Sequence, residues 1–346
     1  MRAVWGMTPE ELKNLMSEWG EQPYRGMQLF RDLQKGLGFD EMTVLGKSLR
    51  QRLQAQMPDP PVRILESHES AQDGTVKLLY GLNDQNCVEG VLMRYHYGVT
   101  LCVSTQVGCA MGCLFCASTL DGCVRNLQAE EMVGQVLCAN QLLAAKGEHV
   151  SRLVLMGSGE PLQNYDEVLR FIRLVTHPEG MNLSVRRISL STCGLPDQIR
   201  QLAREGLDLT LSWSMHGPND AVRKRIMPVA RRYTIAETLD ACEAYYQATG
   251  RRLIIEYAMI DGVNASTRDA AELASVLKGV NCHVNLIALN SVKERSLFGA
   301  SEKQIAQFIS VLNARGISAT RRRTMGEDID GACGQLRKKR MEEQSV

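Results

Sequence analysis

Short apolar runs alternate with longer amphipathic stretches from about residue 99 onward. The runs predict strands at Val99–Val103, Arg152–Met156, Arg187–Leu190, Leu207–Ser212, Leu253–Met259, His283–Leu289 and Ile317–Arg321. The stretches between them predict helices such as Glu130–Lys146, Asp166–His177, Ile235–Thr249 and Thr267–Lys278. Strands that alternate with helices indicate an α/β fold with a parallel sheet. Six such units precede the last strand, which favours a partial (β/α)6 TIM-like barrel over a complete eightfold one.

The first 98 residues follow a different pattern. Apolar residues recur at helical spacing through Leu53 and predict a small helical unit. The proline-rich run Met57–Pro61 cannot continue a helix and marks a boundary. Beyond it, Val76–Tyr80 and Val88–Met93 predict paired strands. The expected domains are a helical accessory domain (1–58), a strand extension (59–98) and a barrel with a C-terminal segment (99–346).

Polar or glycine-rich segments follow the first four predicted strands and the sixth. They are a cysteine-containing loop after the first strand, then Gly157–Pro161, Ser191–Gly194, Ser214–Asn219 and Asn290. Barrel enzymes build their active sites at the carboxyl ends of the strands. We therefore expect these segments to converge on one face of the barrel.

Composition narrows the class of protein without deciding its function. The 346 residues are 44% hydrophobic and 23% charged, which allows a large core and is ordinary for an enzyme. The sequence has no apolar run near the roughly 20 residues that a membrane helix needs, and no apolar leader with a cleavage site. We expect a cytoplasmic protein with no membrane partner.

Charge is nearly balanced, but it is unevenly distributed. A net charge of +1 argues neither for nor against a nucleic-acid partner. The basic runs Arg321–Arg323 and Arg337–Arg340 flank Cys333. They indicate either a surface that binds phosphates or a solvated charged tail.

Cysteine is the residue type that points most directly to chemistry. Eleven cysteines, an odd number, argue against a disulfide framework and favour metal or redox work. Cys109, Cys113 and Cys116 lie close together beside Gly108 and Gly112. Thiolates are the soft ligands that zinc and iron–sulfur clusters prefer, although three buried structural cysteines would give the same spacing. A usual four-iron cluster takes four cysteines, so three leave one metal corner open for a substrate.

The spacing Cys-x-x-x-Cys-x-x-Cys, with Phe115 just before the last cysteine, resembles the cluster loop of radical S-adenosylmethionine (SAM) enzymes. The flanking segments Thr100–Cys109 and Gly331–Leu336 resemble one branch, the RlmN/Cfr family of radical SAM methyltransferases that act on adenosine in RNA. The resemblance implies a [4Fe-4S] cluster held by Cys109, Cys113 and Cys116, with SAM bound to the open iron. It also implies that the N-terminal helical unit helps to hold RNA.

The same resemblance implies roles for ten further residues. Seven match positions that bind SAM: Gly159, Glu160, Ser191, Ser214, Met215, His216 and Asn290. Three match catalytic positions: Glu89, Cys102 and Cys333. The remaining cysteines have no assigned role, although Cys123 and Cys193 fall near the expected site.

The chemistry of the substrate explains why two cysteines outside the cluster are needed. The C2 carbon of adenine is electron-poor and cannot attack a sulfonium methyl group directly. The resemblance implies that one SAM methylates Cys333 and that a second SAM yields a 5′-deoxyadenosyl radical, which takes a hydrogen from that methyl group. The methylene radical adds to adenine, Glu89 takes the proton from the carbon, and Cys102 attacks the sulfur of Cys333 to form a transient disulfide. Turnover then requires an external reductant.

The expected substrates are 23S ribosomal RNA, in the peptidyl transferase region, and tRNA, next to the anticodon. The segment Cys116–Gly122 resembles the type that methylates C2 more than the type that methylates C8 and confers antibiotic resistance. We expect an electron donor such as flavodoxin or ferredoxin, and a monomer. Two other hypotheses remain: a radical SAM enzyme that modifies proteins or small molecules, for which Cys102 and Cys333 would be dispensable, and a zinc-stabilised RNA-binding protein.

Overall fold

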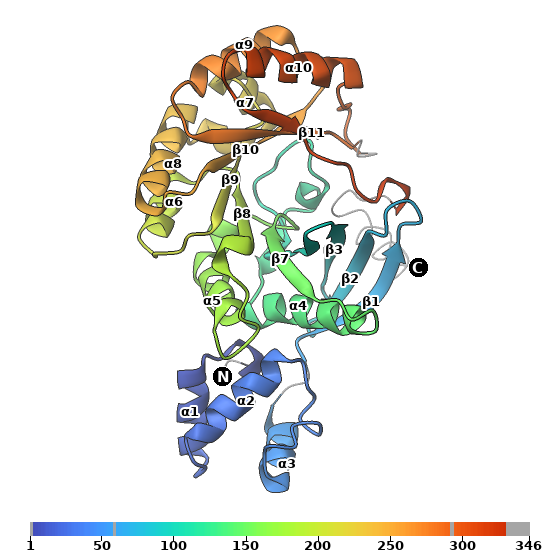
Figure 1. The fold of residues 1–346 in the computed structure, drawn as a ribbon, viewed down its shortest axis with the longest axis vertical. Coiled ribbons are helices and arrows are strands. Elements are labelled where there is room, and N and C mark those ends of the chain that lie inside the picture. The colour runs from blue at the N-terminus through green and yellow to red at the C-terminus, as the bar shows by residue number, and fades with distance from the viewer. Residues whose placement is uncertain (1–2, 58–59, 291–293, 330–346) are drawn as a thin grey trace.

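The computed structural model describes residues 3–57, 60–290 and 294–329 (Figure 1). Cys333 and the basic run Arg337–Arg340 lie outside the described residues. None of the helices within the described residues is both long and apolar enough to cross a membrane.

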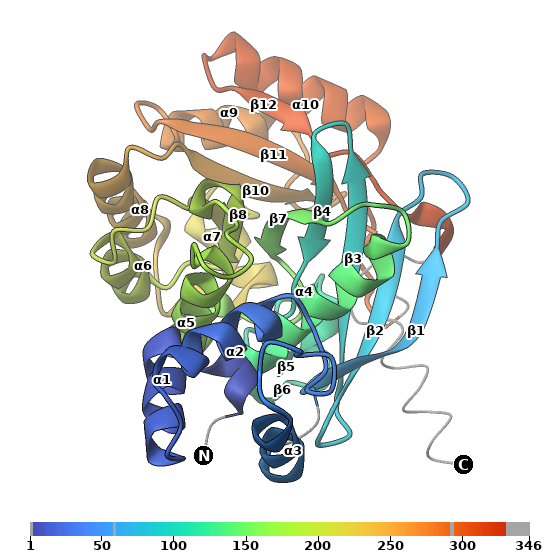
Figure 2. The same cartoon turned by 60° about the horizontal axis from the view of Figure 1, so that its bottom comes forward.

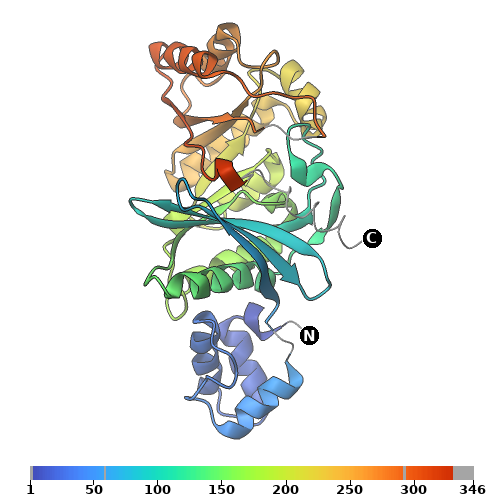
Figure 3. The same cartoon turned by 90° about the vertical axis from the view of Figure 1, so that its right-hand side faces the viewer.

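A small helical unit forms the N-terminal part of the chain, within the stretch that the sequence predicts to be helical. It contains the 3-10 helix η1 (Val4–Gly6) and the helices α1 (Pro9–Glu18), α2 (Tyr24–Gln34) and α3 (Lys47–Gln56). Helix α1 begins at Pro9 because Thr8 and Glu11 form a reciprocal capping box. Figure 3 shows this unit at one end of the molecule. Arg170 of α5 (Tyr165–Thr176) joins it to the barrel through a 2.7 Å ion pair with Glu11.

An antiparallel meander connects the helical unit to the barrel. Its strands β1 (Val62–Glu69), β2 (Val76–Leu82) and β3 (Cys87–Tyr95) pair in chain order, and β3 pairs with β4 (Gly98–Cys102). The sequence predicts β2 and β3. It does not predict β1, because the second half of that strand is exposed and charged and lacks an apolar run.

A parallel sheet continues from β4 and curves into an open barrel. The following strands are β7 (Val150–Leu155), β8 (Ile188–Thr192), β9 (Thr210–Ser214), β10 (Leu253–Met259), β11 (Cys282–Ala288) and β12 (Ala319–Arg321), paired in that order. The helices between them are α4 (Ala129–Ala144), α5, α6 (Pro196–Ala203), α7 (Asp220–Ile226), α8 (Ile235–Thr249), α9 (Thr267–Val276) and α10 (Glu302–Ala314). Figure 2 shows helices on the outer side of the curved sheet. Six βα units precede β12, which confirms the predicted partial (β/α)6 barrel.

Most predicted strands match the observed ones within two residues, and β10 has the predicted bounds. The prediction that a strand begins at Leu207 is wrong, because β9 begins at Thr210. The hydroxyl of Tyr245 donates to the carbonyls of Leu207 and Leu209, so these carbonyls are bonded to a side chain. Leu209 is nevertheless fully buried, which explains why an apolar pattern mistakes this loop for a strand.

Candidate functional site

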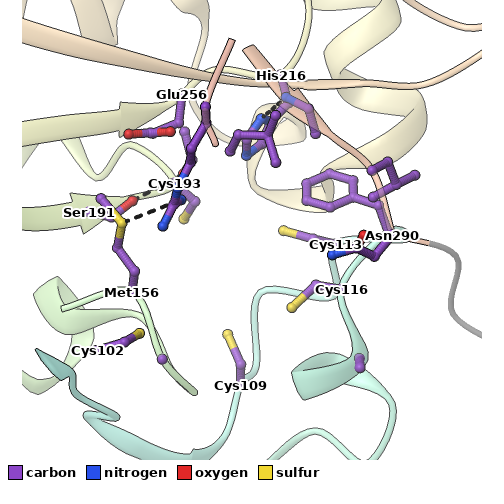
Figure 4. Close-up of a pocket in the computed structure, with 18 of the residues that line it drawn as sticks. Cys102, Cys109, Cys113, Cys116, Met156, Ser191, Cys193, His216, Glu256 and Asn290 are labelled. Carbon is purple, nitrogen blue, oxygen red and sulfur yellow. Dashed lines mark hydrogen bonds between the residues drawn. The ribbon is translucent and has the colours of Figure 1, made fainter. Parts of the chain in front are cut away.

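One cavity of about 380 Å³ lies at the carboxyl ends of the barrel strands (Figure 4). Of the predicted site residues, those that line it are Cys102, Cys109, Cys113, Cys116, Gly159, Glu160, Ser191, Ser214, His216 and Asn290. Residues from β4, β8 and β9 and from the loops after β7 and β11 therefore meet here. The predicted convergence on one face of the barrel is confirmed.

The loop that carries the three cysteines is held by hydrogen bonds at both ends. It connects the short hairpin strands β5 (Gln106–Gly108) and β6 (Cys123–Asn126). The backbone N–H of Cys109 donates to the carbonyl of Gly122 at 2.9 Å. The hydroxyl of Thr119 bonds the carbonyls of Cys113 and Cys116, each at 2.9 Å. Figure 4 shows the three sulfur atoms directed toward the same open space.

The three thiols are protonated in the absence of a metal. Burial raises the pKa of the Cys109 thiol to about 12 and also raises the pKa values of Cys113 and Cys116. Such thiols lose their protons when a metal takes their place. The described residues contain no group of three Cys, His, Asp or Glu side chains gathered around a single ion. A [4Fe-4S] cluster needs no such point, because each thiolate binds a different iron atom.

The Gly159–Glu160 pair follows β7 and approaches the backbone after β4 closely. Gly159 has a φ of +106°, and a Cβ atom there would lie 2.6 Å from the Cβ of Gln106. The backbone N–H of Glu160 donates to the side chain of Gln106 at 2.8 Å. Its carboxylate accepts from the backbone N–H groups of Cys193 at 2.8 Å and Leu162 at 3.0 Å. This buried carboxylate still has lone pairs free to accept from a ligand in the cavity.

A buried histidine forms another wall of the cavity. The Nδ1 atom of His216 accepts from the backbone N–H of Ala258 at 2.9 Å, so the proton of the neutral ring is on Nε2. Burial lowers the pKa of His216 to about 3, and the nearby Arg223 contributes to the shift. The ring of Phe115 meets the imidazole edge-on, with centroids 4.8 Å apart.

Three further SAM-binding candidates differ in placement. The hydroxyls of Ser191 and Ser214, on neighbouring strands, are 3.2 Å apart and both line the cavity. The side chain of Met215 is fully buried and is not part of the cavity lining. Its carbonyl accepts from Nε of Arg223, a residue of α7 that also donates to the carbonyl of Cys193. Arg223 thus ties together the segments that follow β8 and β9.

The structure describes two of the three predicted catalytic residues, Cys102 and Glu89. Cys102 lines the cavity, and burial raises the pKa of its thiol to about 11. Glu89 is buried on the adjacent strand, outside the cavity lining, 3.6 Å from the ammonium of Lys77. Cys333 falls outside the described residues. None of the ten cysteines that the structure describes is in a disulfide.

Sequence reasoning missed one carboxylate in the cavity. Glu256 is 3% exposed and its Oε1 accepts from Asn285 at 3.1 Å, while its Oε2 has no hydrogen-bond partner among the described residues. Burial raises the pKa of this carboxyl. A signal was available, because Glu256 is the one charged residue in the apolar run Leu253–Met259.

Two family models match the chain. The Radical SAM superfamily model matches residues 103–274, and the model of the ribosomal RNA large subunit methyltransferase N-terminal domain matches residues 3–57.

Individual proteins match nearly the whole chain. A protein from Alkaliphilus oremlandii named "Probable dual-specificity RNA methyltransferase RlmN" is 48% identical over 97% of both chains. A protein of the same name from Clostridium perfringens is 46% identical over 98% of this chain and 97% of the relative's chain. The crystal structure of a radical SAM methyltransferase from Sphaerobacter thermophilus superposes with a TM-score of 0.93, at 43% identity, over 97% of this chain and 99% of its own. The chain therefore belongs to the RlmN family of radical SAM RNA methyltransferases.

Proposed function

We propose that the protein methylates C2 of adenosine in two RNAs: 23S ribosomal RNA, in the peptidyl transferase region, and tRNA, next to the anticodon. One observation carries the proposal: of the two further thiols that line the same cavity as Cys109, Cys113 and Cys116, namely Cys102 and Cys193, Cys102 lies on β4 beside the strand of Glu89. A cluster and SAM require only the three loop cysteines, so the Cys102 thiol is available for a different step. The names of the relatives, which describe dual-specificity RNA methyltransferases, support the choice of substrates.

The cofactor contacts follow from the cavity wall. Cys109, Cys113 and Cys116 would hold the [4Fe-4S] cluster, which supplies one electron for the reductive cleavage of SAM. The carboxylate of Glu160 accepts from the ammonium group of SAM, and Gly159 allows close approach. Ser191, Ser214, the backbone of Met215, His216 and Asn290 hold its amino-acid, ribose and adenine parts. The Nε2–H of His216 is a fixed donor, because Ala258 occupies Nδ1.

Cys333 carries the methyl group, and Cys102 releases the product. The Cys333 thiolate attacks the methyl carbon of a first SAM, so a sulfur–carbon bond forms and S-adenosylhomocysteine leaves. A second SAM is consumed in activating that methyl group, which makes two per turnover. After the carbon is joined to adenine, the Cys102 thiolate attacks the Cys333 sulfur, and the S–S bond forms as the S–CH₂ bond breaks. The methylene carbon keeps the electron pair and takes a proton.

Two proton transfers need residues of this chain. Glu89 lies on the strand next to Cys102 and takes the proton from the adenine carbon, and the unpaired electron left on the adduct would pass to the oxidised cluster, so that a closed-shell thioether remains. The Cys102 thiol, whose pKa burial raises to about 11, must lose its proton before it can attack. A dithiol reductant then reduces the disulfide, and flavodoxin or ferredoxin supplies the electron that first reduces the cluster. The protein acts as a monomer.

Methylation at C8 is the second candidate. The segment Cys116–Gly122 favours C2, and the relatives carry the RlmN name. The discriminating experiment is nucleoside mass spectrometry of unmodified 23S ribosomal RNA and tRNA after anaerobic incubation with cluster-loaded protein, SAM and reductant. 2-Methyladenosine supports the proposal, and 8-methyladenosine replaces it with the C8 reaction. No methyladenosine from protein that cleaves SAM would overturn the assignment of substrate.

A further inference from the structure

A second cavity, of about 340 Å³, opens toward the amino ends of the same parallel strands. Its lining includes Arg152 of β7, Arg186 and Arg187 just before β8, and Thr210 at the start of β9. Five residues line both this cavity and the catalytic one: Met93, Met156, Glu256, Arg322 and Arg323. The two cavities therefore adjoin inside the barrel, with these side chains between them.

The lining of the second cavity is strongly basic. It holds five arginines, Arg152, Arg186, Arg187, Arg322 and Arg323, and a single carboxylate, Glu256. Among the described residues, the one ion pair that these arginines form is the 3.3 Å contact between Arg186 and Asp208. Guanidinium groups gathered in this way attract phosphate.

Three buried polar atoms in this cavity lack partners among the described residues. They are Nε of Arg152, Oγ1 of Thr100 and Oε2 of Glu256. Thr100 is 4% exposed and comes from β4, while Arg152 comes from the neighbouring β7. Buried polar groups in proteins are normally paired, and the Arg152 and Thr100 atoms can donate, so these two favour a ligand that accepts hydrogen bonds.

Aromatic rings stand at the edge of the cavity. Tyr95 and Tyr97, at the turn between β3 and β4, stack with centroids 4.9 Å apart and planes 7° from parallel. The guanidinium of Arg152 lies over the Tyr97 ring, 4.7 Å from its centroid. Tyr97 is 49% exposed, but Tyr95 and Arg152 cover the faces of its ring, so the surface that it offers is the ring edge. Exposed aromatic side chains beside arginines commonly contact unpaired RNA bases.

We propose that this basic mouth, formed by Tyr95, Tyr97, Arg152, Arg187, Arg322 and Arg323, binds the RNA strand next to the target adenosine. Its arginines hold a backbone phosphate, and the exposed edge of Tyr97 contacts a neighbouring base. The inference rests on the proposed function, because the target base must occupy the adjoining catalytic cavity. The inference adds a subsite to the proposed RNA-binding site. The RNA strand would pass the amino ends of the barrel strands.

The test measures binding of a fluorescein-labelled single-stranded RNA that contains the target adenosine, by anisotropy at several salt concentrations. Arg187 is exposed and Tyr97 is half-exposed, so Arg187→Gln and Tyr97→Ala change the surface rather than the core. Arg200→Gln is the matched control, because Arg200 lies on the outer helix α6 and pairs with Asp240 at 2.7 Å. Circular dichroism and iron content verify that each variant folds and loads.

The expected results separate the two contacts. Arg187→Gln weakens RNA binding severalfold and lowers the slope of log K against log salt by about 0.7, the value for one single-strand phosphate. Tyr97→Ala weakens binding severalfold, because an aromatic contact to a base is lost, and leaves the salt slope unchanged. Arg200→Gln binds like wild type. Wild-type affinity and slope in both mouth variants would overturn the proposal.

Two further outcomes identify what fails. Adenosine monophosphate is tested as a competitor; if it binds wild type but not Arg187→Gln while RNA affinity is unaffected, the mouth holds a free nucleotide and the RNA proposal is wrong. If wild type forms no methyladenosine but RNA binding depends on the mouth, the subsite stands and the proposed function falls. If wild type methylates RNA and the mouth variants bind RNA normally, the function stands and the subsite falls.

Discussion

The carboxylate of Asp328 accepts a 2.6 Å hydrogen bond from the hydroxyl of Ser70. It also accepts from the backbone N–H of Ala71 at 2.9 Å, and the N–H of Gly326 donates to Asp73 at 2.9 Å. The turn between β1 and β2 therefore holds the last described residues of the chain, as Figure 1 shows beside these strands. Cys333 follows Asp328 by only five residues. This contact fixes the point after which the segment that contains Cys333 begins.

Replacement of Asp328 by Ala should slow RNA methylation by roughly tenfold, because the Cys333 segment loses its fixed origin and samples more positions. The Ser70 hydroxyl keeps its bonds to the N–H groups of Gln72 and Asp73, so the turn itself should survive. Single-turnover methylation of RNA is the measurement. Asp240→Ala, on the outer surface of α8, is the control, and equal rates in the two variants would show that the contact has no catalytic role.

The pKa of Asp73 sets the pH below which its hydrogen bond with Gly326 weakens. Burial would raise the pKa, but hydrogen bonds from Gly326 and Thr75 outweigh it and lower the pKa to about 2. The stabilisation is therefore present above the ordinary aspartate pKa of 3.8 and is lost as the pH falls through about 2. Near neutral pH the Asp73 carboxylate stays ionised, so this hydrogen bond does not change with pH.

Gly159→Ala should disrupt the SAM site through the backbone. The new Cβ would lie 2.6 Å from Gln106 Cβ, at a φ of +106° that L-residues avoid. We expect a loss of about 2–4 kcal/mol in the free energy of unfolding and at least tenfold weaker SAM binding. Gly262→Ala is the control, since its φ is +67° with no neighbour within 4 Å of the new Cβ. Equal effects in both variants, measured by urea unfolding and SAM titration, would mean that close packing against Gln106 is unimportant.

His216 should make the protein less stable in mild acid. Its folded pKa is about 3 against an ordinary 6.5, so below pH 6.5 only the unfolded chain takes up this proton. The contribution is complete above pH 6.5 and is lost as the pH falls toward 3, by up to about 1.4 kcal/mol per pH unit.

The substitution His216→Asn isolates this effect. Asn tolerates the φ of +53°, and its carbonyl can accept from the N–H of Ala258 as Nδ1 does. Urea unfolding of the apo-protein between pH 7 and pH 5 should give a flatter stability profile for the variant than for wild type. Parallel profiles would show that the ring is not kept neutral by burial.

Periodicity predicted the elements best where a strand is apolar throughout, as in Leu253–Met259. The order of strands and polar segments also predicted that the cysteine loop and the polar strand ends lie on one face of the barrel, because parallel strands share a direction. It could not show that Glu89 lies beside Lys77, or that Met215 points into the core while its neighbours line the cavity. Such facts depend on the rotation of each side chain and on its neighbours in the fold.

Contacts between distant segments were also beyond prediction. Ser70 and Asp328 are 258 residues apart, and nothing local in either segment indicates the other. The basic run Arg321–Arg323 was visible in the sequence, but the sequence did not show that its arginines have different surroundings. Arg321 pairs with Glu302 on α10, whereas Arg322 and Arg323 line both cavities.

The most direct test of the central claim follows the methyl hydrogens. Cluster-loaded protein is first given unlabelled RNA and SAM with a CD₃ methyl group, and the methyladenosine is then analysed by mass spectrometry. If the methyl group passes through Cys333 and loses one hydrogen before it joins adenine, the C2-methyl of the product carries two deuterium atoms. A product that retains all three deuterium atoms would mean direct transfer from SAM, and would contradict the roles proposed for Cys333 and Cys102.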